Sequence, residues 1–196
     1  MSEDERLPNP PDPYAPPASI LVLEPAADEG AEEDSLRTFV GSNANYYLGK
    51  WKLLDGAAHA RGFNWAAFFL SGLWIGYRKM YTVAAVFFGI IMAETIAEEV
   101  LFVGVLGQPE APAALTNLVN LVAAVVCGSY GNRWYLSHAR RAIADVRTEE
   151  TEEPAVSAAL AKRGGTSVGA ALVVLALFMA ATFAVFTVLG MVLYPS

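Results

Sequence analysis

The apolar residues of the chain gather in three long runs, at residues 81–106, 113–129 and 167–194. A short polar turn with two prolines, residues 107–112, joins the first two runs, and the third run carries no charged residue. The hydrocarbon core of a bilayer is about 30 Å thick and requires about 20 apolar residues in a helix. The pattern therefore predicts an all-α membrane protein with a helical hairpin and a C-terminal transmembrane helix.

A fourth apolar run, residues 63–77, is rich in Trp and Phe and holds no charge over its 15 residues. As a helix it would cover about 22 Å, which is too short to span comfortably. Cations flank both ends, with Arg78 and Lys79 directly after it. We predict a re-entrant or interfacial segment with both ends on one face of the membrane, because aromatic rings such as Trp favour the interface. An ordinary short spanning helix is the alternative.

Two amphipathic helices are expected beside these runs. In residues 43–54, side chains such as Tyr47 and Trp51 recur at helical spacing, which suits a helix at the headgroup level or a small helix packed on the next segment. In residues 131–147, one side holds Tyr135, Leu136, Ala139, Ala142, Ile143 and Val146, and the other holds Arg133, Arg140, Arg141 and Arg147. The basic side predicts contact with an anionic membrane surface or a plain cationic anchor on the inner face.

Acidic residues are concentrated at the N-terminus, although the whole chain has a net charge of −7. Residues 1–36 hold ten acidic residues, one Arg and seven of the 11 prolines. Such a composition cannot bury a core, so residues 1–37 are predicted to be a disordered acidic tail that recruits or repels a soluble partner. The N-terminus lacks the apolar stretch of a signal peptide. Residues 148–166 are predicted to be a linker, and residues 38–147 the membrane core.

The orientation follows from the distribution of Lys and Arg, which are enriched in short loops on the cytoplasmic side of a membrane. Residues 130–167 carry six cations, whereas the turn at residues 107–112 carries none. We therefore predict a multi-pass inner-membrane protein with a cytoplasmic N-terminus and a C-terminus on the periplasmic side. Because cations lie on both sides of residues 63–77, the same rule places both ends of that segment inside.

The candidate polar residues within the membrane are Glu94, Glu98, Asn117 and Asn120. Glu94 and Glu98 share one helix face. Glu98 and Asn120 are equally far from the centre of the hairpin turn, so we expect these two to meet, directly or through water. Three interpretations stay open for them and for Glu99. They form a path for a proton or cation, they lie at the outer headgroups, or they hydrogen-bond the two helices together.

Other kinds of chemistry have little support. His59 and His138 are isolated from further ligands, and Cys127 is the single cysteine, so no metal site, disulfide or cofactor is predicted. The sequence contains no phosphate-binding glycine loop and no nucleophile elbow. The arginines alone do not predict nucleic-acid binding. We expect the protein not to be an enzyme.

Three blocks carry a family resemblance: NANYYLGKW at residues 43–51, FNWAAFFLSGLWIGYRKMY at residues 63–81 and NRWYLSHARRAI at residues 132–143. In order and spacing they resemble a bacterial membrane family, domain of unknown function 2628, over about residues 38–147. Members often carry a Pro near the position of Gly72, which this chain lacks. The resemblance implies an inner-membrane setting and no known reaction. It also suggests that the blocks form one cytoplasmic-face unit, in which Asn64 caps or bonds free backbone and Arg78 and Lys79 hold lipid phosphates.

Two functions are therefore expected. The first is a non-enzymatic membrane scaffold or interaction module, built from the aromatic segment, the basic helices and the acidic tail. The alternative is a small transporter or channel component that uses the intramembrane Glu and Asn residues. So small a chain encloses little space, so a transport role would require a homo-oligomer.

Overall fold

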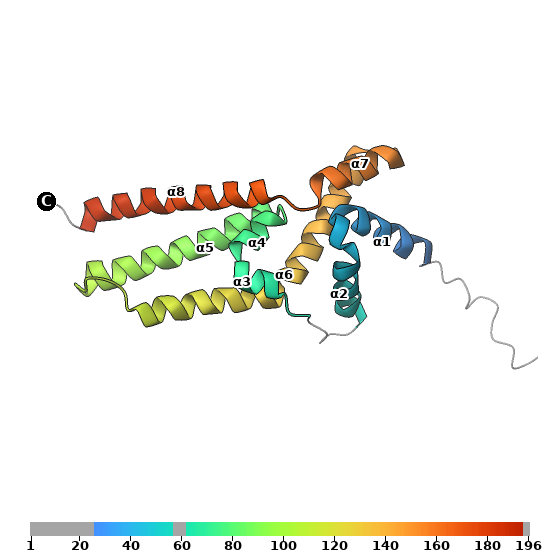
Figure 1. Cartoon of the computed structure of the whole chain (residues 1–196). Helices are drawn as coiled ribbons and strands as arrows, with labels where there is room; N and C mark the ends of the chain where they lie inside the picture. The colour runs from blue at the N-terminus through green and yellow to red at the C-terminus, as the bar shows by residue number, and fades with distance from the viewer. Residues whose placement is uncertain (1–25, 57–61, 194–196) are drawn as a thin grey trace, which may run out of the picture.

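In the computed structural model the chain is described at residues 26–56 and 62–193, which form helices and no strand (Figure 1). The helices are α1 (Ala26–Val40), η2 (Gly41–Asn43), α2 (Ala44–Gly56), α3 (Trp65–Leu70), α4 (Gly72–Tyr77), α5 (Tyr81–Glu99), η3 (Val100–Val105), α6 (Ala113–Glu149), α7 (Glu153–Arg163) and α8 (Val168–Leu193). The predicted all-α class is confirmed. Residues 1–25, 57–61 and 194–196, with most of the predicted acidic tail and His59, lie outside the described residues.

Three helices, α5, the N-terminal half of α6 and α8, run side by side and form one half of the molecule (Figure 1). Their surfaces are apolar and exposed, as Ile90 (63%), Leu118 (57%) and Phe183 (77%) illustrate. Within the described residues, two helices are long and apolar enough to cross a membrane, Ala113–Glu149 and Val168–Val192. Helix α5 is not one of them, so the expected third span has no such support.

The other half, which we call the head, contains α1, α2, the C-terminal half of α6 and α7 (Figure 1). Here the apolar side chains are buried against one another, as in a soluble helical domain. The most deeply buried include Phe39, Val40, Trp51, Tyr135, Val146 and Leu160. The residues predicted to form the apolar face of 131–147 are part of this core, so the face itself is confirmed.

The head corrects two predictions about order. Residues 26–40 form helix α1, and its end packs into the core through Leu36, Phe39 and Val40, so the predicted disorder is wrong for residues 26–37. The prediction from charge failed because the acidic residues of this helix are followed by Leu36, Phe39 and Val40, which bury their side chains in the head. The predicted linker, residues 148–166, contains helix α7, which buries Val156 and Leu160.

Helix α6 corrects a third prediction, because one continuous helix of 37 residues replaces the separate helices at 113–129 and 131–147. At 1.5 Å per residue it is about 55 Å long, well over the thickness of a hydrocarbon core. Its basic half does not present its apolar face to a lipid surface, because α1, α2 and α7 cover that face. Of the two alternatives for residues 43–54, the helix packs on protein, although on α6 rather than on the next segment.

The aromatic segment is broken in the middle. Helices α3 and α4 meet at Ser71, which has a φ of 39° and directly precedes Gly72. Helix α3 packs on α6, where a Cβ at Gly131 would lie 2.9 Å from Cβ of Ala67. Helix α4 packs on α8, where a Cβ at Gly76 would lie 3.1 Å from Cα of Ala171. Glycine thus permits the close approach of both helices.

Candidate functional site

The start of the aromatic segment is tied to α6 by a buried pair of asparagines. The Nδ2 of Asn64 donates to Oδ1 of Asn132 at 2.9 Å, and Nδ2 of Asn132 donates to the carbonyl oxygen of Gly62 at 2.7 Å. The backbone N–H of Asn64 donates to the carbonyl oxygen of Gly128 at 2.8 Å. Its side-chain oxygen also accepts from the N–H of Ala67, which confirms the expected cap of the short helix.

The end of the segment is tied to α6 one helical turn further on, through Arg78. Its guanidinium lies over the rings of Tyr47 and Tyr135, at 4.5 Å and 4.9 Å from their centroids, and Nη1 donates to the Tyr135 hydroxyl at 3.3 Å. Arg78 is 3% exposed, and among the described residues it has no ion-pair partner. Cation–π attraction therefore replaces a carboxylate as its stabilising contact.

Tyrosine 135 is the centre of this cluster. Its ring lies 4.9 Å from that of Tyr47, 5.5 Å from that of Trp51 and 6.2 Å from that of Trp74. Burial raises the pKa of Tyr135 to about 12, against the opposing effect of the Arg78 charge. The hydroxyl therefore stays protonated at neutral pH. We call the set of Trp51, Asn64, Arg78, Asn132 and Tyr135 the junction.

Lys79 also has a contact within the protein. Its Nζ donates to the carbonyl oxygens of Lys162 and Gly164, at 3.1 Å and 2.6 Å, at the C-terminal end of α7. A cation at that end of a helix is favourable, because the last carbonyl groups carry partial negative charge. The burial of Arg78 is inconsistent with the expected lipid-phosphate contact, whereas for Lys79 that contact stays a prediction.

The other basic candidates lie on α6 within the head. Arg133, Arg140 and Arg141 are all exposed. The Nε of Arg140 pairs with Glu32 of α1 at 2.8 Å, so its charge faces another helix. Arg133 and Arg141 present their charges at the surface near the apolar helices.

The structure brings the acidic candidates together but not with the predicted partner. Glu94 and Glu98 interact with each other, and the hydroxyl of Thr116 donates to Oε2 of Glu98 at 3.1 Å. Asn117 and Asn120 are exposed, and Glu98 bonds to Thr116 within the described residues, so the expected direct hydrogen bond between Glu98 and Asn120 is not formed. The other oxygen of Glu98 is buried, and no hydrogen-bond partner faces it within the described part of the chain.

The register error has a geometric cause. The α5 helix continues into the π-helical segment η3, which places more residues in each turn and advances less per residue. Figure 1 also shows that the chain runs back from the end of η3 before α6 begins. Equal residue counts from the turn centre therefore predict Asn120 as the partner of Glu98, whereas Thr116, one helical turn earlier on α6, is the residue that bonds to it.

The junction was only partly visible in the sequence. The family resemblance predicts Asn64 as a cap, but its pairing with Asn132, 68 residues away, depends on the tertiary fold. The signal that was available is the position of the polar Asn132 among the aromatic residues of its block. Across the described ranges, no group of three or more His, Cys, Asp or Glu residues is placed to hold a metal ion.

These features define an all-helical protein with two helices of a length and composition that suit a membrane. Residues 32–141, more than half of the chain, match the family model described as protein of unknown function DUF2628, and the chain belongs to this family. The resemblance drawn from the three sequence blocks is thus confirmed. The comparison with curated proteins and that with solved structures gave no match.

Proposed function

We propose that the protein is a non-enzymatic membrane module, which holds a helical head at the cytoplasmic face of an inner membrane as a platform for protein interaction. The observation that carries the proposal is the division of apolar surface between the two halves. The helices α5, α8 and the first half of α6 expose large apolar side chains along their length, whereas the head buries its own. A hydrocarbon environment explains why the first half exposes its apolar side chains, and an aqueous environment explains why the head buries its own.

The junction supports a re-entrant aromatic segment within this arrangement. Both ends of the segment bind α6, Asn64 at Asn132 and Arg78 at Tyr135, and these two α6 positions are only about 4.5 Å apart along the helix axis. The two ends of a segment that spanned the membrane would contact α6 at positions far apart along its axis. The tip is apolar and exposed, with Phe69 at 73% and Leu70 at 52%, as insertion into a bilayer requires.

The same arrangement supports the proposed orientation. The exposed arginines Arg133 and Arg141 lie on the head side of the apolar helices, whereas the turn of residues 107–112 at their far end carries one acidic residue and no cation. Cations favour the cytoplasmic side. The head, with the N-terminal residues that precede α1, therefore belongs inside.

A topology measurement tests this proposal. In a Cys127→Ser background, we would place single cysteines at the exposed positions Tyr81, Glu110 and Thr148 and label intact cells with a membrane-impermeant reagent. We expect Glu110→Cys to label in intact cells, and Tyr81→Cys and Thr148→Cys to label only after the inner membrane is permeabilised. Labelling of Thr148→Cys from outside would refute the orientation.

A transport function has one observation in its favour, the buried and unpartnered oxygen of Glu98 beside Glu94. The exposure of Asn117 and Asn120 counts against it, because they do not continue a polar path along the hairpin. Reconstituted protein should give no proton or cation flux above that of empty vesicles. A flux that is lost in Glu98→Gln and kept in Asn120→Ala would refute the platform function and support a transporter.

A further inference from the structure

A groove of about 510 Å³ runs between α5 and α6 on the surface of the apolar half. On α5 it is lined from Thr82 to Glu94, which is a length of about 18 Å in a helix. One leaflet contributes about 15 Å of a 30 Å hydrocarbon core. The groove therefore has the length of a single acyl chain in one leaflet.

The lining changes character along the groove in the order that a phospholipid requires. The middle part is apolar and includes Phe87, Ile90 and Val122. Toward the head comes Trp134, whose ring stacks on Tyr130 with centroids 6.2 Å apart, and such rings favour the glycerol level of a bilayer. Arg141 follows two helical turns later on the same side of α6, at the level expected for phosphate.

Charge determines which way round such a ligand lies. Arg141 stands at the head end of the groove, and Glu94 stands at the opposite end. An anionic headgroup is attracted to the first and repelled by the second. Helix α6 has four exposed arginines, of which Arg141 is the one that lines the groove. Arg140 pairs with Glu32, and Arg147 pairs with Glu153.

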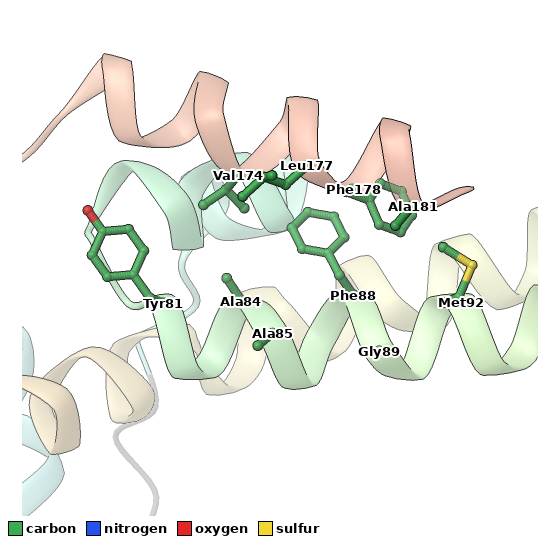
Figure 2. A pocket seen from close by; sticks show the side chains of 10 residues that line it. All are labelled: Tyr81, Ala84, Ala85, Phe88, Gly89, Met92, Val174, Leu177, Phe178 and Ala181. Carbon is green, nitrogen blue, oxygen red and sulfur yellow. The ribbon is translucent and has the colours of Figure 1, made fainter. Parts of the chain in front are cut away.

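A second pocket, between α5 and α8, provides the comparison (Figure 2). It has a volume of about 440 Å³, and Phe88 and Phe178 line it with their ring centroids 4.4 Å apart, so the two rings are in contact. Tyr81 stands at one end, and none of the residues that line this pocket is charged. It accommodates hydrocarbon but has no group that selects a phosphate.

We propose that the α5–α6 groove binds one anionic phospholipid of the leaflet next to the head, with its phosphate at Arg141 and one acyl chain along α5. This inference rests on the proposed insertion of the apolar helices into a membrane. The headgroup chemistry that it requires is a phosphodiester with net negative charge, as in phosphatidylglycerol. A zwitterionic lipid fills the same groove with a smaller electrostatic gain.

Fluorescence quenching by brominated acyl chains tests the groove directly. The full chain is reconstituted in phosphatidylcholine vesicles that contain a small fraction of either brominated phosphatidylglycerol or brominated phosphatidylcholine. The emission of Trp134 is obtained as the difference between the wild-type protein and Trp134→Phe. We expect about fivefold stronger apparent binding of the anionic lipid at Trp134, the gain expected from one cation near a membrane surface.

Two variants distinguish the groove from general surface charge. Arg141→Gln should abolish the preference for the anionic lipid, so that both lipids bind equally. Quenching by brominated phosphatidylcholine should stay unchanged. Arg133→Gln is the matched control, because Arg133 is an exposed arginine of the same helix that does not line the groove. It should keep the preference, and an equal loss in both variants would overturn the inference.

Trp65 separates failure of this inference from failure of the proposed function. It is 63% exposed on the aromatic segment and remains in Trp134→Phe. If both brominated lipids quench Trp65 but quench Trp134 equally, the chain is in the bilayer and the groove does not select an anionic lipid. If neither lipid quenches any tryptophan, the apolar helices are not in the bilayer and both proposals fall.

Discussion

Replacement of Asn132 by alanine should loosen the attachment of the aromatic segment to α6. The Asn132 side chain is 3% exposed and makes two hydrogen bonds, one to Asn64 and one to the carbonyl oxygen of Gly62. Each bond contributes about 1 kcal/mol, and the Nδ2 of Asn64, which is 2% exposed, would be left buried without its partner. Together these effects predict a loss of about 2–4 kcal/mol in the free energy of unfolding.

A double-mutant cycle tests whether the pair acts as a unit. Asn64→Ala removes the same hydrogen bond and also the cap of α3, which contributes about 1 kcal/mol. If the two asparagines stabilise the fold through each other, the double variant should lose less than the sum of the single losses. For residues in contact, the expected coupling is about 0.5–3 kcal/mol.

The assay is equilibrium unfolding of the detergent-solubilised protein, followed by tryptophan fluorescence. Asn120→Ala is the matched control, because Asn120 is an exposed asparagine of the same helix, and its replacement should change stability by less than about 0.5 kcal/mol. Our account of the junction would be refuted if Asn132→Ala were as mild as this control. It would also be refuted if the losses at Asn64 and Asn132 were simply additive.

Three further predictions concern the contacts around the junction. Gly131→Ala would place a methyl group 2.9 Å from a Cβ of α3 and should cost about 1–3 kcal/mol in the same assay, whereas Gly89→Ala, which meets open space, should be neutral or stabilising. Lys79→Met removes the ammonium group that binds the end of α7 and should cost about 1 kcal/mol, with faster hydrogen exchange in α7; unchanged exchange would contradict this role. Burial, together with the charge of Arg141, lowers the pKa of His138, so the unfolded chain binds a proton more readily. Stability should therefore fall as the pH drops below about 6.5, and His138→Asn should reduce that pH dependence.

The elements that the sequence predicts well are those with a local signal. The uncharged run at 167–194 corresponds to α8, and the run at 63–77 appears as two short helices with a break at Ser71. The apolar face of residues 131–147 was also predicted, because helical periodicity identifies a buried face whatever covers it. Periodicity cannot say whether lipid or protein covers that face, and here it is protein.

The errors arise where tertiary contacts decide the outcome. The acidic charge of residues 26–37 indicates disorder, but Leu36 and Phe39 recur at helical spacing and dock on the head core. Arg78 follows an apolar run and looks like a surface anchor, yet Tyr47 and Tyr135 come from two other helices to cover it. Neither arrangement has a signature within a window of neighbouring residues.

The connection between α7 and α8, which lies beyond the family match, is attached to the family region by two backbone hydrogen bonds. Between α7 and α8, the N–H of Gly165 donates to the carbonyl oxygen of Phe39 at 2.7 Å, and the N–H of Ser167 donates to that of Tyr77 at 2.9 Å. A side chain at Gly164 would collide with the Phe39 backbone, so glycine is required there. The connection thus joins the end of α1 in the head to the end of α4 in the aromatic segment. Both contacts are backbone hydrogen bonds, and they are made within the three residues 165–167. A displacement of the head therefore either moves the aromatic segment with it or breaks one of these hydrogen bonds.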